Sequence, residues 1–157
     1  MSPLKSLLLG LALALPSLLL AQIDPQNVTI SRDEWGVPHI HGRTDNDVAY
    51  GLAYANAEDN FYDMQLNLLM ARHRQGEVLG KDGAIVDFAV QILHTQEIID
   101  QRYDQDISPA FDAYLKAYAQ GVNAYAAARP KEVLLKKVFP VGPKDILAGY
   151  SMSLVFM

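Results

Sequence analysis

The feature that most constrains the fold is a proline-free stretch over residues 48–79, in which apolar residues recur at helical spacing. Residues 44–47 directly before it combine capping side chains with negative charge, which stabilise the first turn of a helix. The apolar positions form an approximate stripe: Val48, Leu52, Ala55, Phe61, Met64, Leu68 and Leu69. We therefore predict a long helix that ends at residues 80–83. Gly51 is a weak point at which this helix could break in two.

A serine–proline pair gives the clearest helix start in the chain. Ser108 is a good capping residue, and Pro109 suits the first helical position, where its missing N–H has no partner to lose. Apolar or aromatic residues then recur every three or four positions: Phe111, Tyr114, Leu115, Tyr118, Val122 and Tyr125. The pattern predicts a helix that ends near Ala128, before Pro130. A further helix is expected over residues 85–103.

The last predicted helix begins at Pro143, where Asp145 adds negative charge to the first turn. Residues 146–157 then run largely apolar to the end of the sequence, and neither a closing glycine nor a polar or charged tail follows the last turn. We expect such a helix to be cut before its end, and to seek burial on all sides.

Two short extended segments precede the long helix. Val28 and Ile30 alternate with polar neighbours, which is the spacing of a strand with one inward face. Residues 37–41 give a second extended segment, and Pro38 restricts it to a sheet edge or a strand start because proline lacks an N–H. Residues 33–36 lie between the two segments, so we predict a hairpin.

Residues 1–21 differ from everything that follows them. Lys5 is their only charged residue, residues 7–15 contain only Leu, Ala and Gly, and a proline then precedes a small residue at Ala21. This order is typical of a secretory signal peptide that is cut after Ala21. The alternative is a membrane anchor, but a spanning helix needs about 20 apolar residues. We expect a signal peptide over 1–21 and a periplasmic or secreted protein over 22–157.

Charge and cysteine content exclude several classes of protein. Thirteen basic residues against eighteen acidic ones give a formal net charge of −5, which argues against a nucleic-acid partner. The absence of cysteine rules out a disulfide scaffold, a zinc ribbon, an iron–sulfur cluster and a thiol nucleophile. Half of the 157 residues are hydrophobic, so the chain has the composition of one globular domain. After removal of the leader we expect no membrane association.

Two pairs of side chains are candidates for chemistry. His39 and His41 alternate on one extended segment and so share a face, where they could begin the metal site of a metallohydrolase. No third ligand is identifiable, and surface histidines near a turn are the simpler interpretation. Glu58 and Asp59 could serve as paired catalytic carboxylates. A solvated helix face or a polar contact with another helix is the simpler interpretation for them.

A third pair consists of His73 and Glu77, which lie four residues apart on the predicted helix and could pair or bind a metal. An ordinary surface pair is again the simpler interpretation. The serines beyond the leader do not lie in a nucleophile-elbow pattern, and no glycine-rich phosphate loop is present. The residues alone therefore give no complete catalytic site and no metal site.

Several segments, taken in order, resemble penicillin acylases and acyl-homoserine-lactone acylases. The matching segments are residues 28–40 (D/E-x-x-G-x-P-H-I), residues 51–61 (G-x-x-x-A-x-A-[EQ]-D), residues 64–80 with Met64 and Arg72 (Q-M…R…G…E-x-x-G), residues 118–124 (Y-A-x-G-x-N) and residues 139–146 (P-x-D). Each motif is weak alone, but their order is that of the family. The resemblance covers residues 27–157, nearly all of the chain beyond the leader.

The resemblance implies the α-chain portion of an N-terminal-nucleophile hydrolase. Members are exported precursors that cut themselves into an α chain and a β chain, and the first residue of the β chain, usually serine, is the nucleophile with its own α-amino group as base. The expected fold is α+β, the mostly helical α-chain part of an αββα hydrolase with a short N-terminal hairpin. The expected partner is the β chain in an αβ heterodimer, and the expected substrate is a small N-acylated amine of penicillin-like or acyl-homoserine-lactone-like type. No catalytic residue is expected in this chain.

The resemblance also implies one substrate-binding position. Counted without gaps from Pro143 and Asp145, Leu154 falls where penicillin acylases place a residue of the acyl pocket. The calcium-binding glutamate of the family would fall beyond Met157, so we expect no metal ligand in this chain, although calcium is possible in the full-length enzyme. The alternative function is a self-contained helical periplasmic binding module without catalysis, which would need a closed core and a finished last helix.

Overall fold

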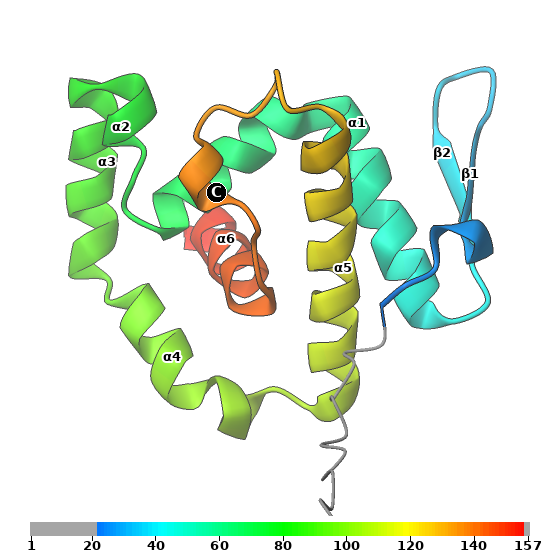
Figure 1. The fold of residues 1–157 in the computed structure, drawn as a ribbon. Helices are drawn as coiled ribbons and strands as arrows, with labels where there is room; N and C mark the ends of the chain where they lie inside the picture. The colour runs from blue at the N-terminus through cyan, green and yellow to red at the C-terminus, as the bar shows by residue number, and fades with distance from the viewer. Residues whose placement is uncertain (1–21, 156–157) are drawn as a thin grey trace, which may run out of the picture.

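The computed structural model describes residues 22–155, and the side chains up to residue 154 (Figure 1). The expected signal peptide lies outside this part of the chain. The helices are α1 (Asp45–Ala71), α2 (Gly76–Leu79), α3 (Lys81–Ile92), α4 (Thr95–Asp106), α5 (Pro109–Ala128) and α6 (Pro143–Val155). Short 3-10 turns cover Pro25–Asn27 and Lys136–Val138. Within the described range, no helix is long and apolar enough to cross a membrane.

The predicted hairpin is present and packs on α1. Strands β1 (Thr29–Arg32) and β2 (Pro38–His41) pair antiparallel, with Ile30 opposite Ile40. A Cβ atom on Gly51 would lie 2.6 Å from Cγ2 of Ile40 and 2.7 Å from Cγ1 of Val28. Gly51 therefore lets the hairpin approach the helix closely. It does not break α1, as the sequence suggested it could. The backbone leaves helical geometry at Asn60 instead (φ −144°, ψ 42°).

The end of α1 differs from the prediction. The helix stops at Ala71, eight residues before the predicted end, in a hydrogen-bonded C-terminal turn: the N–H of His73 donates to the carbonyl of Met70, and that of Arg74 donates to that of Leu69. His73 has a φ of +54°, the left-handed conformation that glycine usually supplies in this turn. Because the residue there is histidine, the sequence carried no visible stop signal.

A second left-handed histidine divides the helix predicted over residues 85–103. His94 has a φ of +51° and separates α3 from α4, so that one predicted helix is two. Within α3, the Asp87 carboxylate accepts hydrogen bonds from the N–H groups of Gln75 and Gly76 at the start of α2, each 2.8 Å long. These bonds fold α2 against α3. The chain thus turns where the apolar pattern predicted continuous helix.

The starts of the last two long helices are confirmed. The Ser108 hydroxyl accepts the N–H of Phe111 at 3.3 Å, which caps α5 as predicted. α5 packs tightly against α1, because a Cβ atom on Gly121 would lie only 2.3 Å from the carbonyl oxygen of Tyr50. In Figure 1 α6 lies between α5 and the arm formed by α3 and α4, and it contacts α1, α4 and α5.

These contacts enclose the main core. Its large buried side chains come from five of the helices: Leu68, Leu69, Val90, Ile99, Tyr103, Leu115, Tyr118, Val122, Ile146 and Met152. α6 buries one face through Ile146 and Met152 and leaves Tyr150 and Leu154 exposed. The expectation that α6 needs burial on all sides is thus met on one face only. The predicted α+β class, mostly helical with a short N-terminal hairpin, is confirmed.

Candidate functional site

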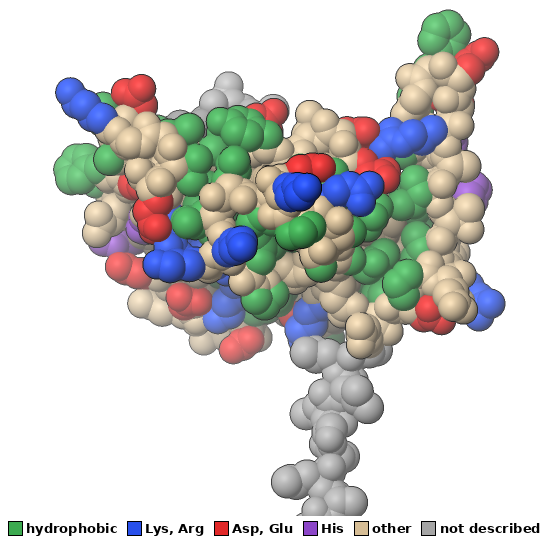
Figure 2. All heavy atoms as spheres, turned by 45° about the horizontal axis from the view of Figure 1, so that its top comes forward, with side chains coloured by type: hydrophobic (Ala, Val, Ile, Leu, Met, Phe, Trp, Pro, Cys, Tyr) green, Lys and Arg blue, Asp and Glu red, His purple; other side chains and the backbone are tan. Residues whose placement is uncertain are grey.

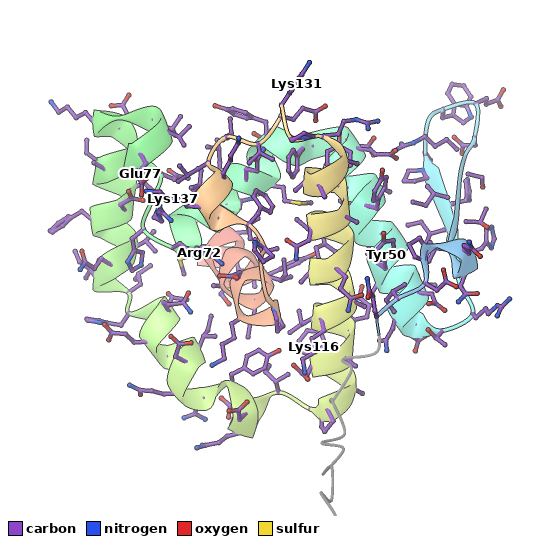
Figure 3. All side chains as sticks on the ribbon, viewed as in Figure 1. Tyr50, Arg72, Glu77, Lys116, Lys131 and Lys137 are labelled. Carbon is purple, nitrogen blue, oxygen red and sulfur yellow. The ribbon has the colours of Figure 1, made fainter. Side chains whose placement is uncertain are left out.

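The start of α6 is fixed by an ion pair with the end of α1. The Arg72 guanidinium donates from Nε to Oδ1 of Asp145 at 2.7 Å and from Nη2 to Oδ2 at 2.6 Å. Its Nη1 donates to the carbonyl of Val138 at 2.8 Å. The two side chains are 25% and 15% exposed, so the pair is largely shielded from water. Figure 3 labels Arg72 where α6 passes the end of α1. One side chain therefore joins α1, the loop before α6 and the first turn of α6.

Further hydrogen bonds fix the same turn. Asp145 Oδ2 also accepts the N–H of Gly142 at 2.7 Å, which closes the first turn of α6. The side-chain amide of Asn123, on α5, makes two bonds with Val141: its Nδ2 donates to the carbonyl and its Oδ1 accepts the N–H, both at 2.8 Å. The position of α6 is thus specified from two helices by directional bonds.

A cavity of about 410 Å³ lies beside α6, between it, α1 and α5. Its lining residues are Asn56, Asn60, Asp63, Met64, Asn67, Leu68, Tyr118, Ile146, Gly149, Tyr150 and Ser153. Asn56 Nδ2 donates to the Tyr118 hydroxyl at 3.0 Å, and burial raises the pKa of that phenol. The Ser153 hydroxyl donates to the carbonyl of Gly149 at 3.0 Å. The cavity offers hydrogen-bonding groups but no nucleophile beside a base.

Leu154, the predicted acyl-pocket residue, lies on the exposed face of α6. Its side chain is 73% exposed, and Tyr150, one turn earlier, shares that face. The neighbouring Ser153 borders the cavity. The structure therefore presents Leu154 on the surface of the described part of the chain, and its role in substrate binding stays a prediction.

The histidines of the hairpin lie on its outer face. Both are exposed, because Ile40 between them points to Gly51 on α1. The Nε2 atom of His39 lies 3.2 Å from Oδ2 of Asp33. This carboxylate makes no hydrogen bond to His41. Over residues 22–154 no group of three His, Asp or Glu side chains is placed to hold a metal ion. The structure thus supplies no third ligand for a site built on these two histidines.

The carboxylates of Glu58 and Asp59 hold the hairpin to α1. Arg32 Nη2 lies 3.1 Å from Glu58 Oε2 and 2.9 Å from Asp59 Oδ1, while its Nη1 donates to the carbonyl of Gly36 at 2.8 Å. Hydrogen bonds to Asp59 and Glu58 raise the pKa of this guanidinium. The polar-contact interpretation is right in kind, but the partner is the hairpin and not a helix.

The pairing suggested for His73 and Glu77 is wrong. His73 lies beyond the end of α1 and Glu77 on α2, so they do not share a helix face. Glu77 accepts a hydrogen bond from Arg74, and this bond lowers the pKa of its carboxyl. In Figure 3 Glu77 lies close to Lys137 of the loop between α5 and α6, whose charge adds to the lowering.

Sequence reasoning did not find the pair of Arg72 and Asp145, although each falls in a segment that resembles the acylases. The two residues are 73 positions apart, and no periodicity relates them. The usable signal was a charged residue beside an apolar run in each of the two motifs, together with the need to pair charges on burial.

Comparisons with known proteins decide the family. The sequence pattern of the family described as penicillin amidase matches residues 27–153. This chain belongs to that family. It is 33% identical over 100 residues to penicillin acylase 2 proenzyme of Pseudomonas sp. strain SE83, and 33% identical over 100 residues to acyl-homoserine lactone acylase QuiP of Pseudomonas fluorescens strain Pf-5. Both alignments cover 64% of this chain, and they cover 13% and 12% of those relatives.

The solved structures give the same assignment. The thermostable penicillin G acylase from Alcaligenes faecalis matches with a TM-score of 0.66 and 26% identity, over 82% of this chain and 72% of that chain. Penicillin G acylase is an N-terminal-nucleophile hydrolase, so the predicted fold family is confirmed. The family member described here spans about an eighth of the length of its curated relatives.

Proposed function

We propose that this penicillin amidase family member is the α-chain portion of an exported acylase that hydrolyses the amide bond of N-acylated amines. The observation that carries the proposal is a contrast in coverage. The chain aligns with 12–13% of the curated relatives but with 72% of one chain of a solved penicillin G acylase. This contrast fits one chain of a processed heterodimer, whose β chain supplies the nucleophile, better than an enzyme complete in itself.

The serine hydroxyl groups of the described residues support the assignment of the nucleophile to another chain. Ser108 accepts the N–H that caps α5, and Ser151 and Ser153 donate to carbonyls within α6. Ser31 faces the carbonyl of His39 at 3.5 Å, and no base is hydrogen-bonded to any of these four oxygens. A serine nucleophile needs a base within hydrogen-bond reach. The chain described here therefore contributes helices and a pocket wall to the proposed enzyme.

An exposed apolar face on α3 supports a β-chain partner. Ile85, Phe88 and Ile92 lie at helical spacing on one side of the helix and are 59%, 67% and 62% exposed. Figure 2 shows further apolar patches between charged side chains on the face that it presents. Contiguous apolar surface of this kind marks an interface. A self-contained binding module, the competing proposal, would have to leave this face in water.

The proposed substrate is a small N-acylated amine, either penicillin-like or acyl-homoserine-lactone-like, with Leu154 in contact with the acyl group. The exposed, apolar face that Leu154 shares with Tyr150 suits a wall closed by a second chain. Calcium, if the complete enzyme binds it, would take ligands beyond the residues described here. Export to the periplasm rests on the leader-like residues 1–21.

Expression of the chain together with the sequence that follows it in its gene tests the proposal. We expect self-cleavage into two chains, an α chain that begins at Gln22, and hydrolysis of acyl-homoserine lactones or phenylacetyl amides. Residues 22–157 expressed alone are the matched control and should be silent. Turnover by this control that survives His39→Ala and His41→Ala would place the catalytic residues in this chain and contradict the proposal. A gene that ends at Met157 without a partner would favour the binding module.

A further inference from the structure

We infer that Arg72 is a positioning residue that sets the acyl-chain selectivity of the enzyme by fixing the direction of α6. The inference rests on the proposed function, because it assumes that Leu154 borders the acyl group. Arg72 is far from that position along the sequence and acts through Asp145 and the loop before α6. α6 is held differently at its start and along its length.

Along its length α6 is held mainly by apolar contacts. Ile146, Ala148 and Met152 are 5%, 0% and 1% exposed and face the core. Burial of such side chains keeps the helix against its neighbours, but it is not directional. Apolar contacts alone therefore tolerate a small rotation or tilt of the helix, as cores tolerate repacking at constant volume.

At its start α6 is held by directional bonds. The paired bonds from Arg72 to Asp145 are charge-assisted, and a bidentate guanidinium–carboxylate pair fixes the relative orientation of its two groups. The third bond, to the carbonyl of Val138, ties the same guanidinium to the loop before the helix. The backbone of Arg72 is held at the end of α1, because its N–H donates to the carbonyl of Leu68. Arg72 therefore fixes the direction of α6 relative to α1.

Leu154 lies far along α6 from the pair of Arg72 and Asp145, so a small change in the direction of α6 moves Leu154 appreciably. Leu154 follows Asp145 by nine residues, which is about 13.5 Å along a helix. A tilt of about 10° at the first turn therefore moves Leu154 by about 2 Å, given that rise. A displacement of that size exceeds the length of one methylene, and one methylene in an apolar pocket changes specificity about 10–200-fold. Loss of the pair between Arg72 and Asp145 should therefore alter which acyl chain fits.

The test compares the complete, matured acylase with three variants on a series of N-acyl amides of increasing acyl-chain length. In Arg72→Lys a point charge replaces the planar fork, so one charged bond remains and the bidentate geometry is lost. In Arg72→Gln the charge is lost as well. The matched control is Arg102→Lys, because Arg102 makes an equally bidentate pair with Asp106 (2.7 and 3.0 Å) within the single helix α4.

We expect Arg72→Lys to shift the ratio of kcat/KM between long and short acyl chains by about tenfold, mainly through KM, as one methylene of misfit does. Arg72→Gln should shift it further, and Arg102→Lys should leave the ratio unchanged. If Arg72→Lys gives no matured enzyme, Asp145→Asn replaces it, because asparagine retains an acceptor for the N–H of Gly142.

Two results overturn the inference. One is an unchanged selectivity ratio in the variants of Arg72 and Asp145. The other is an equal loss of activity for every chain length, which is what a pair with a purely structural role would give. An unmutated enzyme that matures but hydrolyses no N-acyl amide is a different result: it contradicts the proposed function itself, and it is recognised before any variant is made.

Discussion

Single residues decide how closely the elements of this protein approach each other. Gly121 allows α5 to lie against the backbone of α1, and Gly51 allows the hairpin to lie against the same helix. The two positions differ in what a new methyl group would meet. At Gly51 it would meet side-chain methyl groups of Ile40 and Val28, whereas at Gly121 it would meet a carbonyl oxygen that cannot move without the helix.

Gly121→Ala should therefore destabilise the protein strongly. The added Cβ would lie 2.3 Å from the carbonyl oxygen of Tyr50, so the two helices must separate, and overpacking of this kind costs about 1–3 kcal/mol or more. Gly149→Ala is the matched control in α6, where nothing lies within 4 Å and alanine should add about 0.5–1 kcal/mol of stability. Urea denaturation of the soluble, assembled protein measures both. Equal midpoints for the two variants would contradict the packing described.

Asp33 should make the stability of the hairpin turn dependent on pH. Its carboxylate accepts the N–H groups of Val37 and Trp35, each at 2.9 Å, and lies 3.2 Å from the His39 ring. The hydrogen bond from Val37, then that from His39, lowers the pKa of Asp33 below its ordinary value of 3.8. The stabilisation is thus present above the unfolded pKa and is lost as the pH falls through the lower folded one.

We therefore expect Asp33→Asn to lower the thermal midpoint at pH 7, and we expect the gap to the unmutated protein to close as the pH falls below about 4, where the unfolded carboxyl titrates. Glu34→Gln, in the same turn and exposed, is the control and should show little effect at either pH. Differential scanning calorimetry across this range measures the gap. A constant gap down to pH 2 would show that the charge of Asp33 is not what holds the turn.

At the scale of helices and strands, sequence reasoning succeeded where the boundary signal is local. Ser108 and Pro109 mark the start of α5 within two residues, and the alternation around Ile30 marks a strand. Sequence reasoning failed at the ends of α1 and α3. There histidine occupies the left-handed position in which a glycine would have indicated the end of a helix. The kink at Asn60 has no local signal either. The ion pair of Arg72 and Asp145 depends on three-dimensional packing, which the spacing of residues along the sequence does not predict.

The left-handed histidines give a direct test of that explanation. A non-glycine residue in this conformation costs about 1–2 kcal/mol, since its Cβ crowds the following carbonyl. His94→Gly should therefore raise the free energy of unfolding by about 1 kcal/mol, because the exposed pair with Glu97 that it removes is worth little. His94→Ala is the control: it removes the same pair and keeps the strain. Chemical denaturation that ranks alanine at or above glycine would refute the explanation.

For the whole molecule, we expect the exposed apolar face of α3 to limit solubility. Ile85, Phe88 and Ile92 are each more than half exposed, and Tyr150 and Leu154 add apolar surface on α6. Burial of one such side chain is worth about 1.5–3 kcal/mol, so several left in water approach the total stability of a small domain. The sequence pointed to the last helix as the source of this problem, whereas the structure places much of it on α3.

We expect residues 22–157 expressed alone to aggregate or to bind a hydrophobic dye strongly. Co-expression with the downstream segment should yield soluble protein. Replacement of Phe88 by glutamate in the isolated chain should reduce dye binding, whereas Ala110→Glu, at an exposed position on α5, should not. Size-exclusion chromatography with light scattering decides between the outcomes. A sharp monomer peak without dye binding would favour the self-contained binding module.

The packing of α1 on α5 has a consequence for the order in which the protein is made. The face of α1 around Tyr50 is covered by Gly121, about 70 residues later, and the end of α1 is fixed by Asp145, later still. When only α1 to α4 have been synthesised, the central helix α1 of the nascent chain therefore still lacks its principal neighbours, α5 and α6. Contacts this distant in sequence form slowly. We therefore expect the core of this protein to close later in synthesis than a core built from helices adjacent in sequence.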